Sequence, residues 1–299
     1  MIRPLSTVSL AALMLAACTP EAAEPAAVDA VAETASAEAA PPAAPPAAPE
    51  GFQTAYSLET ENYAVQLDID PAILAFDPAL AWRLWSYGKT SLDELAVSAD
   101  EGRKMADEDA AASGEKSWFM GYTLEIAHKA TGVFDDVISV SDTVATYTGG
   151  AHPNYFLGGG IYRKGETESL PLSTFIADPA AFGEFAIKAL AIEKQERGYA
   201  DEPAAIEASL EELLAPTTDA PDVYKGRFVF APSSESGKIG GITLVFSPYD
   251  IGSYAEGAYE VTLPATELTP ILTEAWAPRF GGEPVIEEVV EEEQPASAE

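Results

Sequence analysis

Only the middle of this chain has the composition of a folded domain. Residues 20–50 are almost wholly Ala, Pro and Glu, and residues 281–299 read GGEPVIEEVVEEEQPASAE. Such segments lack the large apolar side chains that a hydrophobic core requires. We therefore expect an extended linker over residues 18–51, a disordered acidic tail over residues 281–299, and a folded part of about 230 residues between them.

The first residues have the pattern of an export signal. Arg3 precedes an apolar run that ends in the string Leu15-Ala16-Ala17-Cys18, which contains the only cysteine of the chain. This pattern predicts a lipoprotein signal peptide over residues 1–17, whose removal leaves Cys18 as the acylated first residue. The alternative is a plain secretory signal followed by an unmodified cysteine.

Lipidation of Cys18 would decide where the protein resides. Two or three acyl chains anchor a protein stably, whereas a single chain binds a membrane reversibly. Thr19, rather than an aspartate, follows the cysteine, and this is the pattern of Gram-negative lipoproteins that are passed on to the outer membrane. The sequence thus predicts a cell-envelope protein held by its N-terminal lipid, on the outer membrane and facing the periplasm.

The chain is strongly acidic. Removal of residues 1–17 takes away one arginine and no acid, so 15 basic and 49 acidic residues remain and the formal charge is −34. This charge repels nucleic acid and anionic lipid headgroups, so we expect no nucleic-acid partner. Two interpretations stay open: the charge serves solubility in the envelope, or it attracts a basic partner.

Alternating apolar residues predict several strands. Such alternation marks the runs 63–69 and 118–128, and residues 129–132 are expected to form a turn that leads into a return strand over 133–147. A second hairpin is expected between 155–163 and 168–175, around Lys164-Gly165. Three further strands are predicted at 226–231, 240–246 and 259–263.

Two Asp-Pro pairs predict helix starts, because aspartate caps a helix and proline suits its first position. They are Asp77-Pro78, which opens a helix towards Met105, and Asp178-Pro179, which opens a helix that ends before Gly198. Shorter helices are expected at 206–214 and 267–276. Because strands and helices come in clusters, the prediction is an α+β fold with antiparallel sheets and packed helices.

Two strings stand out, YTGGAHPN at 147–154 and FSPYDIGSYAEG at 246–257. Together they resemble the RsiV-like family, the paired bacterial domains of unknown function 4163 and 3298. That pair occurs in the extracellular part of a lysozyme-sensing anti-sigma-factor receptor and in the N-terminal region of some peptidoglycan deacetylases. The resemblance covers roughly residues 56–276. It implies an α+β ligand-binding module with a 4163-like subdomain at 52–163 and a 3298-like subdomain at 164–280.

The same strings supply the candidate binding residues. Glycines permit positive φ, a residue before proline is held extended, and tyrosine rings combine an apolar body with a polar tip. Each string is therefore either a rigid structural connector or a loop that presents side chains to a ligand. The candidates for ligand binding are Tyr147, Gly149, Gly150, His152, Asn154, Tyr249 and Tyr254.

Catalytic motifs are missing from the sequence: there is no G-x-S-x-G, Walker loop or H-E-x-x-H. A zinc site would need His128 and His152 together with carboxylates, but His128 fits better on a strand face. We therefore predict no catalytic residue, no metal and no cofactor.

The sequence as a whole favours a membrane-anchored envelope lipoprotein with a non-catalytic binding module. Its predicted ligand is a basic protein such as lysozyme, or a cell-wall component such as peptidoglycan. The alternative is a hydrolase that acts on envelope glycan, since carboxylates are too abundant for a catalytic pair to be located or dismissed.

Overall fold

A computed structural model describes residues 48–199, 203–217 and 222–286. The predicted signal peptide, Cys18, most of the linker and residues 287–299 of the predicted tail lie outside the described residues. Among the described residues, no helix has both the length and the apolar character needed to cross a membrane.

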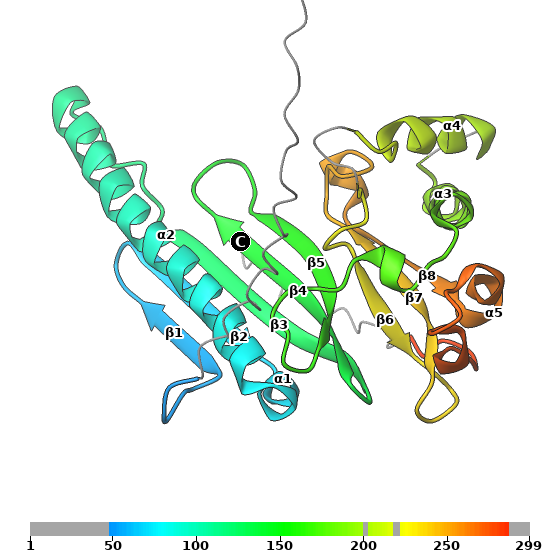
Figure 1. Ribbon diagram of the computed structural model, residues 1–299. Helices are drawn as coiled ribbons and strands as arrows, with labels where there is room; N and C mark the ends of the chain where they lie inside the picture. The colour runs from blue at the N-terminus through cyan, green and yellow to red at the C-terminus, as the bar shows by residue number, and fades with distance from the viewer. Residues whose placement is uncertain (1–47, 200–202, 218–221, 287–299) are drawn as a thin grey trace, which may run out of the picture. The chain divides into compact units, whose positions relative to one another are not determined.

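A five-stranded sheet forms the first half of the fold, with its strands in chain order (Figure 1). The strands are β1 (Ala55–Glu59), β2 (Tyr63–Ile69), β3 (Tyr122–Phe134), β4 (Val137–Tyr147) and β5 (Asn154–Arg163). All neighbours are antiparallel except β2 and β3, which are parallel. Parallel neighbours need a crossover, and here it consists of α1 (Pro71–Phe76) and the long α2 (Pro78–Ser113).

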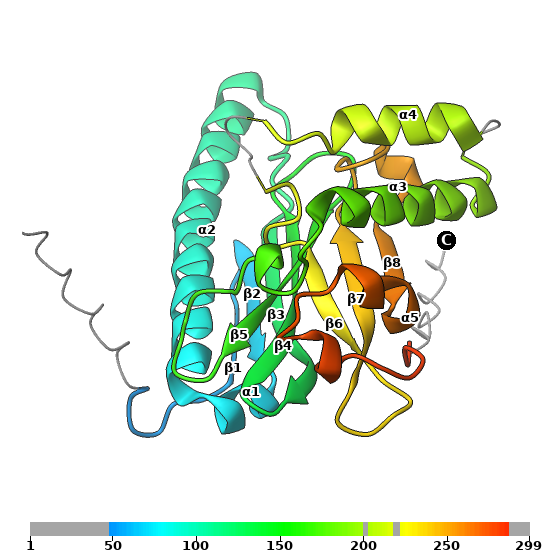
Figure 2. The same cartoon turned by 45° about the vertical axis from the view of Figure 1, so that its right-hand side comes forward.

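A three-stranded antiparallel sheet forms the second half. Its strands are β6 (Phe228–Pro232), β7 (Ile239–Phe246) and β8 (Tyr259–Pro264). Figure 2 shows α3 (Pro179–Glu196) and α4 (Pro203–Leu213) side by side, and α3 packs against β8. Short helical turns complete this half: Leu172–Thr174, Tyr254–Glu256, α5 (Ala265–Leu268), Thr269–Ile271 and Ala277–Arg279.

The two sheets are joined by direct contacts. The backbone N–H of Gly159 in β5 donates to the carbonyl of Gly226, just before β6, at 2.9 Å. The buried hydroxyl of Ser139 in β4 accepts from the backbone N–H of Phe230 in β6 at 2.8 Å. The larger hydrophobic cluster lies around the second sheet, yet it includes Phe134 and Ile161 of the first. The α+β fold expected from the sequence is thus confirmed, with mostly antiparallel pairing.

The turn of the β3–β4 hairpin lies later than predicted. The sequence places it at 129–132, but β3 continues to Phe134 and the chain reverses at Asp135, whose φ is 53°. Gly132 instead follows a bulge, where a Cβ atom would lie 2.6 Å from the ring of Phe134. Gly132 therefore allows the ring of Phe134 to lie close to the strand backbone. Trp118 and Met120, predicted within this strand, precede it and are exposed.

Two predicted elements are replaced by irregular structure because of proline, which cannot donate a backbone hydrogen bond. Residues 168–175 form no strand: a single bridge joins Ser169 to Tyr162, and a helical turn follows Pro171. Residues 267–276 form no continuous helix, since α5 ends at Leu268 and Pro270 lies in a separate turn. The sequence also missed β1, α1 and the parallel pairing of β2 with β3.

The first residues of the predicted tail lie against the second sheet. The backbone N–H of Gly281 donates to the carbonyl of Ile239 at 3.0 Å, and that of Val285 donates to the carbonyl of Pro232 at 2.8 Å. The chain thus remains hydrogen-bonded to β6 and β7 past residue 280.

Candidate functional site

The two sequence motifs meet at one surface. The ring of His152, in the β4–β5 connection, stacks on the ring of Tyr254, with centroids 3.9 Å apart and planes 20° from parallel. The ring of Tyr249 lies 5.5 Å from that of Tyr254. His152 and Tyr249 are exposed and Tyr254 is half-buried. We call His152, Tyr249 and Tyr254 the aromatic platform.

The first motif forms a tight loop beneath His152. Gly149 and Gly150 have φ values of 91° and 111°, so they supply the positive φ that the sequence predicts for them. The hydroxyl of Tyr147 donates to the carbonyl of Gly150 at 3.2 Å. Asn154 is exposed and opens β5 opposite Thr146. These four candidate residues shape the loop, while His152 alone of the first motif joins the platform.

One carbonyl links the two motifs. The Pro153 oxygen accepts a hydrogen bond from the Tyr254 hydroxyl at 2.6 Å and lies 2.9 Å from Nδ1 of His152. Close by, the hydroxyl of Tyr155 accepts from the backbone N–H of Ala258 at 3.1 Å. Hydrogen bonds between the two motifs therefore fix the relative positions of the stacked rings.

Tyr249 has an unusual backbone conformation. Its φ is 75°, a region that costs a residue with a side chain about 1–2 kcal/mol, and its ring is 64% exposed. The flanking turn holds this conformation, because the Asp250 carboxylate accepts from the backbone N–H of Ser247 at 2.7 Å and is paired with Arg227. The ring of Tyr249 is thus exposed on a turn that hydrogen bonds and an ion pair hold in place.

A buried ionic network anchors the second motif from below. The ammonium group of Lys194 on α3 is paired with the Glu256 carboxylate and donates to the carbonyl of Ile251 at 2.8 Å. The Tyr259 hydroxyl and the backbone N–H of Ser253 also donate to Glu256, at 2.7 and 2.8 Å. Lys194 is buried, so this network replaces the water that its charge would otherwise need.

The network controls the ionisation of its members. Burial alone would raise the pKa of Glu256, but the hydrogen bonds from Lys194, Tyr259 and Ser253 outweigh burial and lower that pKa to about 2. Burial and the hydrogen bond to the Glu256 carboxylate both raise the pKa of the Tyr259 hydroxyl. Glu256 is therefore ionised and Tyr259 protonated at neutral pH.

The end of α3 completes the support. Arg197 donates to the carbonyl of Ala258 at 2.7 Å and lies 4.4 Å from the ring centroid of Tyr259. The Tyr199 hydroxyl donates to the carbonyl of Ala255 at 3.0 Å. The acids of the second motif, Asp250 and Glu256, are both paired, and residues 147–154 contain none. The platform is thus supported by hydrogen bonds and ion pairs, and neither motif contributes an unpaired carboxylate.

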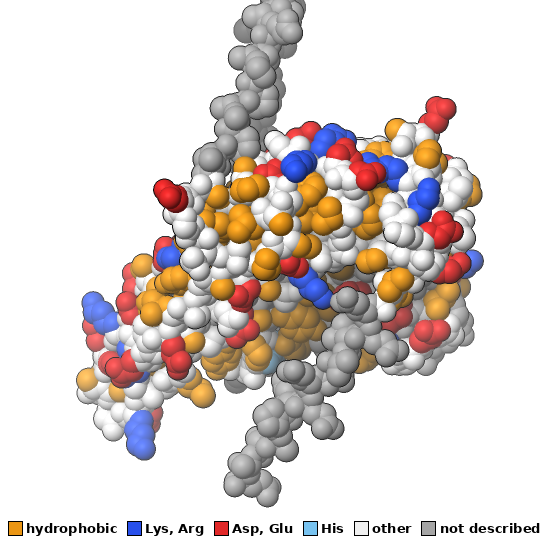
Figure 3. Space-filling model, turned by 90° about the horizontal axis from the view of Figure 1, so that it is seen from below, with side chains coloured by type: hydrophobic (Ala, Val, Ile, Leu, Met, Phe, Trp, Pro, Cys, Tyr) orange, Lys and Arg blue, Asp and Glu red, His pale blue; other side chains and the backbone are white. Residues whose placement is uncertain are grey.

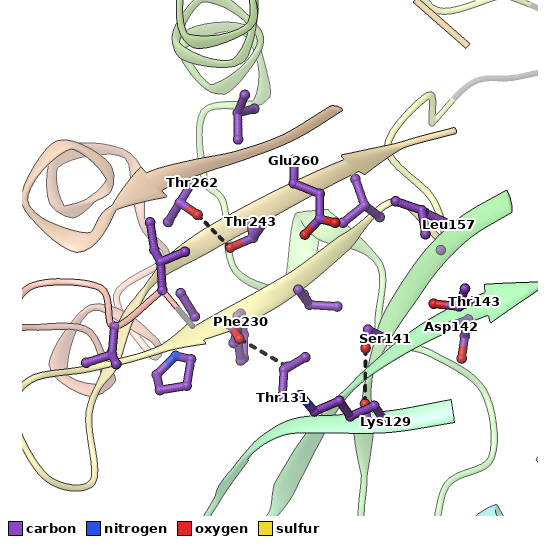
Figure 4. Close-up of a pocket in the computed structure, with 18 of the residues that line it drawn as sticks. Lys129, Thr131, Ser141, Asp142, Thr143, Leu157, Phe230, Thr243, Glu260 and Thr262 are labelled. Atoms are coloured by element: carbon purple, nitrogen blue, oxygen red, sulfur yellow. Dashed lines mark hydrogen bonds between the residues drawn. The ribbon is translucent and has the colours of Figure 1, made fainter. Parts of the chain in front are cut away.

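Sequence reasoning missed a groove between the outward faces of the two sheets. It has a volume of about 600 Å³, and Figure 3 shows a recess with hydrophobic side chains around it. Leu157 of β5, Thr243 of β7 and Glu260 of β8 are among the residues that line it (Figure 4). Thr243 and Glu260 lie next to the core residues Leu244 and Tyr259 along their strands, and no sequence motif marks the cavity. We call this cavity the inter-sheet groove.

The two histidines have separate partners. Nδ1 of His128 lies 2.6 Å from the Asp142 carboxylate, and its Nε2 is buried without a hydrogen-bond partner. His152 stacks on Tyr254 instead. Within the described ranges, no group of three or more His, Cys, Asp or Glu side chains is placed to hold a metal ion.

Comparisons with known proteins place the second motif in a family region. Two solved structures are similar, each at 17% identity: a DUF3298 family member from Bacteroides fragilis (75% of this chain, 92% of that chain, TM-score 0.48) and one from Pseudomonas aeruginosa PAO1 (77%, 95%, 0.44). No curated protein matches the chain. Residues 191–266, which hold Lys194, Tyr249 and Glu256, match the family described as "Protein of unknown function (DUF3298)".

Proposed function

We propose that this protein is a lipid-anchored, non-catalytic binding module of the bacterial envelope that recognises a basic protein such as lysozyme. The observation that carries the proposal is the aromatic platform. Two motifs about a hundred residues apart in the sequence join to present stacked rings on the surface, above a network that holds them rigid.

The platform has the properties of a binding hot spot. Aromatic side chains dominate the energetics of protein interfaces, especially when few rotamers must be frozen on binding. His152 and Tyr254 already stack, and the ring of Tyr249 is exposed on a strained backbone. Because strained residues gather at functional sites, the conformation of Tyr249 supports a binding role over a packing role.

The charge of the protein favours a basic partner. Residues 48–286 contain 15 basic and 38 acidic residues, a formal charge of −23 for this part of the chain. A field of this sign speeds the approach of a cationic protein, and its effect falls as salt rises. The aromatic platform would then supply the short-range contacts that slow dissociation.

Anchoring in the envelope rests on Cys18. We expect Cys18→Ala to abolish membrane attachment, because the proposed lipid is the anchor and no helix among the described residues is able to span a membrane. Cell fractionation measures this outcome. A correctly processed Cys18→Ala protein that still partitions into detergent would contradict the lipoprotein proposal.

Binding kinetics test the platform. We expect full-length protein to bind a c-type lysozyme in dilute salt, with an association rate that falls as salt is added. His152→Ala removes the stacked ring and should raise the dissociation rate roughly tenfold, which equals about 1.4 kcal/mol. Tyr87→Ala is the matched control, since Tyr87 is an exposed aromatic residue on α2, outside the platform.

Each outcome has a separate meaning. Absence of binding in dilute salt by calorimetry would remove lysozyme as the ligand, and co-sedimentation with purified peptidoglycan would point to the cell wall instead. A His152→Ala variant that binds normally but melts several degrees lower would give the loop a structural role. Release of soluble fragments from peptidoglycan would favour the alternative, a glycan hydrolase.

A further inference from the structure

The inter-sheet groove is distinct from the aromatic platform and is large enough for a ligand. Its volume of about 600 Å³ lies within the range of small-molecule sites, which is about 300–1,000 Å³. Its walls come from both sheets and from α3, which contributes Ala189, Ile192 and Glu193. Because hydrogen bonds join the two sheets, the fold fixes the positions of the walls of the groove.

The walls of the groove are largely apolar. Leu157, Val229 and Val245 line its two sides, together with the half-exposed Ile192. Polar side chains among them are mostly satisfied: Thr243 and Thr262 share a hydrogen bond of 2.8 Å, and Thr131 donates to Ser139 at 2.7 Å. Such a lining suits the aliphatic or aromatic body of a ligand.

The carboxylates of the groove favour a cation. Asp142 is paired with His128, and Glu193 is paired with Arg197. Glu260 takes part in none of the ion pairs among the described residues, and Figure 4 shows it on β8 among the side chains that line the groove. Among the described lining residues, Lys129 is the basic one.

The chain next to the groove is acidic in sequence. Val285 and Ile286 line the groove, and six of the residues 287–299 that follow directly in the sequence are glutamates. We propose that the inter-sheet groove binds a small organic cation with an apolar body, whose charged group pairs with Glu260.

Three probes of one shape test this proposal. They are 4-phenylbutylammonium, 4-phenylbutanol and 4-phenylbutanoate, which differ only in the charge of the end group. Calorimetry with full-length protein in lipid nanodiscs, with empty nanodiscs as the blank, measures their affinities. We expect the cation to bind roughly tenfold tighter than the alcohol, and the anion to bind weakest.

Variants assign the charge preference to one carboxylate. Glu260→Gln should reduce the affinity for the cation to that of the alcohol, and Glu260→Lys should reverse the preference toward the anion. Glu267→Gln, at an exposed position outside the groove, is the control and should bind like the original protein. His152→Ala should also bind the cation normally, which separates this site from the platform.

Equal affinities for the three probes, or unchanged cation binding in Glu260→Gln, would overturn the proposal. Because Glu260 is exposed, its substitutions should leave the melting temperature unchanged, and this measurement confirms that a loss of binding is not a loss of fold. Failure of the cation to bind at all would likewise overturn the groove's assignment and leave the platform untouched.

Discussion

At the scale of single residues, Tyr249 adopts a positive φ, which residues with a side chain normally avoid. Among the described residues outside glycine, positive φ occurs at Asp135 and Tyr249. Asp135 is in a hairpin turn, where aspartate tolerates this conformation. Tyr249 has a bulky side chain, and the surrounding hydrogen bonds of Ser247 and Asp250 are what maintain its backbone.

This contrast gives a testable separation of stability from binding. Tyr249→Gly relieves the strained φ but makes the unfolded chain more flexible, so the two effects nearly cancel and stability should change by less than about 1 kcal/mol. Lysozyme should dissociate faster, because a platform ring is lost. Urea unfolding and binding kinetics measure the two effects. Marked destabilisation with normal binding would show that the ring has a packing role.

At the scale of elements, the second motif depends on α3 more than on its own sequence. Lys194, Arg197 and Tyr199 at the end of α3 all bond to residues 251–258. The Ser253–Glu256 capping box adds a local contact. The loop should therefore loosen when this network loses its charge, even though the rest of the fold remains.

Acid should weaken the network. The pKa of Glu256 is about 2 in the folded protein, below its usual 4.5, so its stabilisation is complete above about pH 5 and is lost as pH falls toward about 2. The full loss amounts to roughly 3 kcal/mol at most. Urea unfolding should show Glu256→Gln less stable than the original protein at neutral pH, with the gap narrowing in acid. A gap that stays constant with pH would contradict the linkage.

Element starts were easier to predict than element ends. Asp77 and Asp178 accept hydrogen bonds from the first turns of α2 and α3, as their Asp-Pro pairs indicate. Capping is local chemistry between near neighbours, so it is visible in the sequence. The hairpin turn at Asp135 was missed because Gly132 was expected to form the turn. A glycine is needed there for another reason, since the ring of Phe134 leaves no room for a side chain.

At the scale of the whole molecule, the junction of the two sheets depends on Gly159. A Cβ atom at Gly159 would lie 2.4 Å from Val229 and 3.0 Å from the carbonyl of Val140. Both distances are too short for packed atoms. The absence of a side chain at Gly159 therefore allows β5 to approach β6.

A matched pair of substitutions tests this junction. Gly159→Ala should destabilise the protein by about 1–3 kcal/mol through overpacking and should weaken cation binding in the groove. Gly183→Ala, within α3 where a Cβ atom meets only the Tyr224 hydroxyl at 3.9 Å, should be neutral or stabilise by up to about 1 kcal/mol. Thermal unfolding of both variants is the measurement. Equal stability of Gly159→Ala and the original protein would mean that the sheets separate easily.

The sequence by itself determined the α+β class, most strands, the starts of the long helices and the residues of both motifs, because periodicity, capping and composition are local properties. The subdomains 52–163 and 164–280 stay a prediction from the family resemblance, and His152, Tyr249 and Tyr254 were named as candidates. Only the tertiary structure decided that these three rings meet, that Lys194 and Glu256 support them, and that the outward faces of two sheets enclose a groove. Those features join residues about 60 to 160 positions apart, and no local pattern encodes which distant side chains will share a surface.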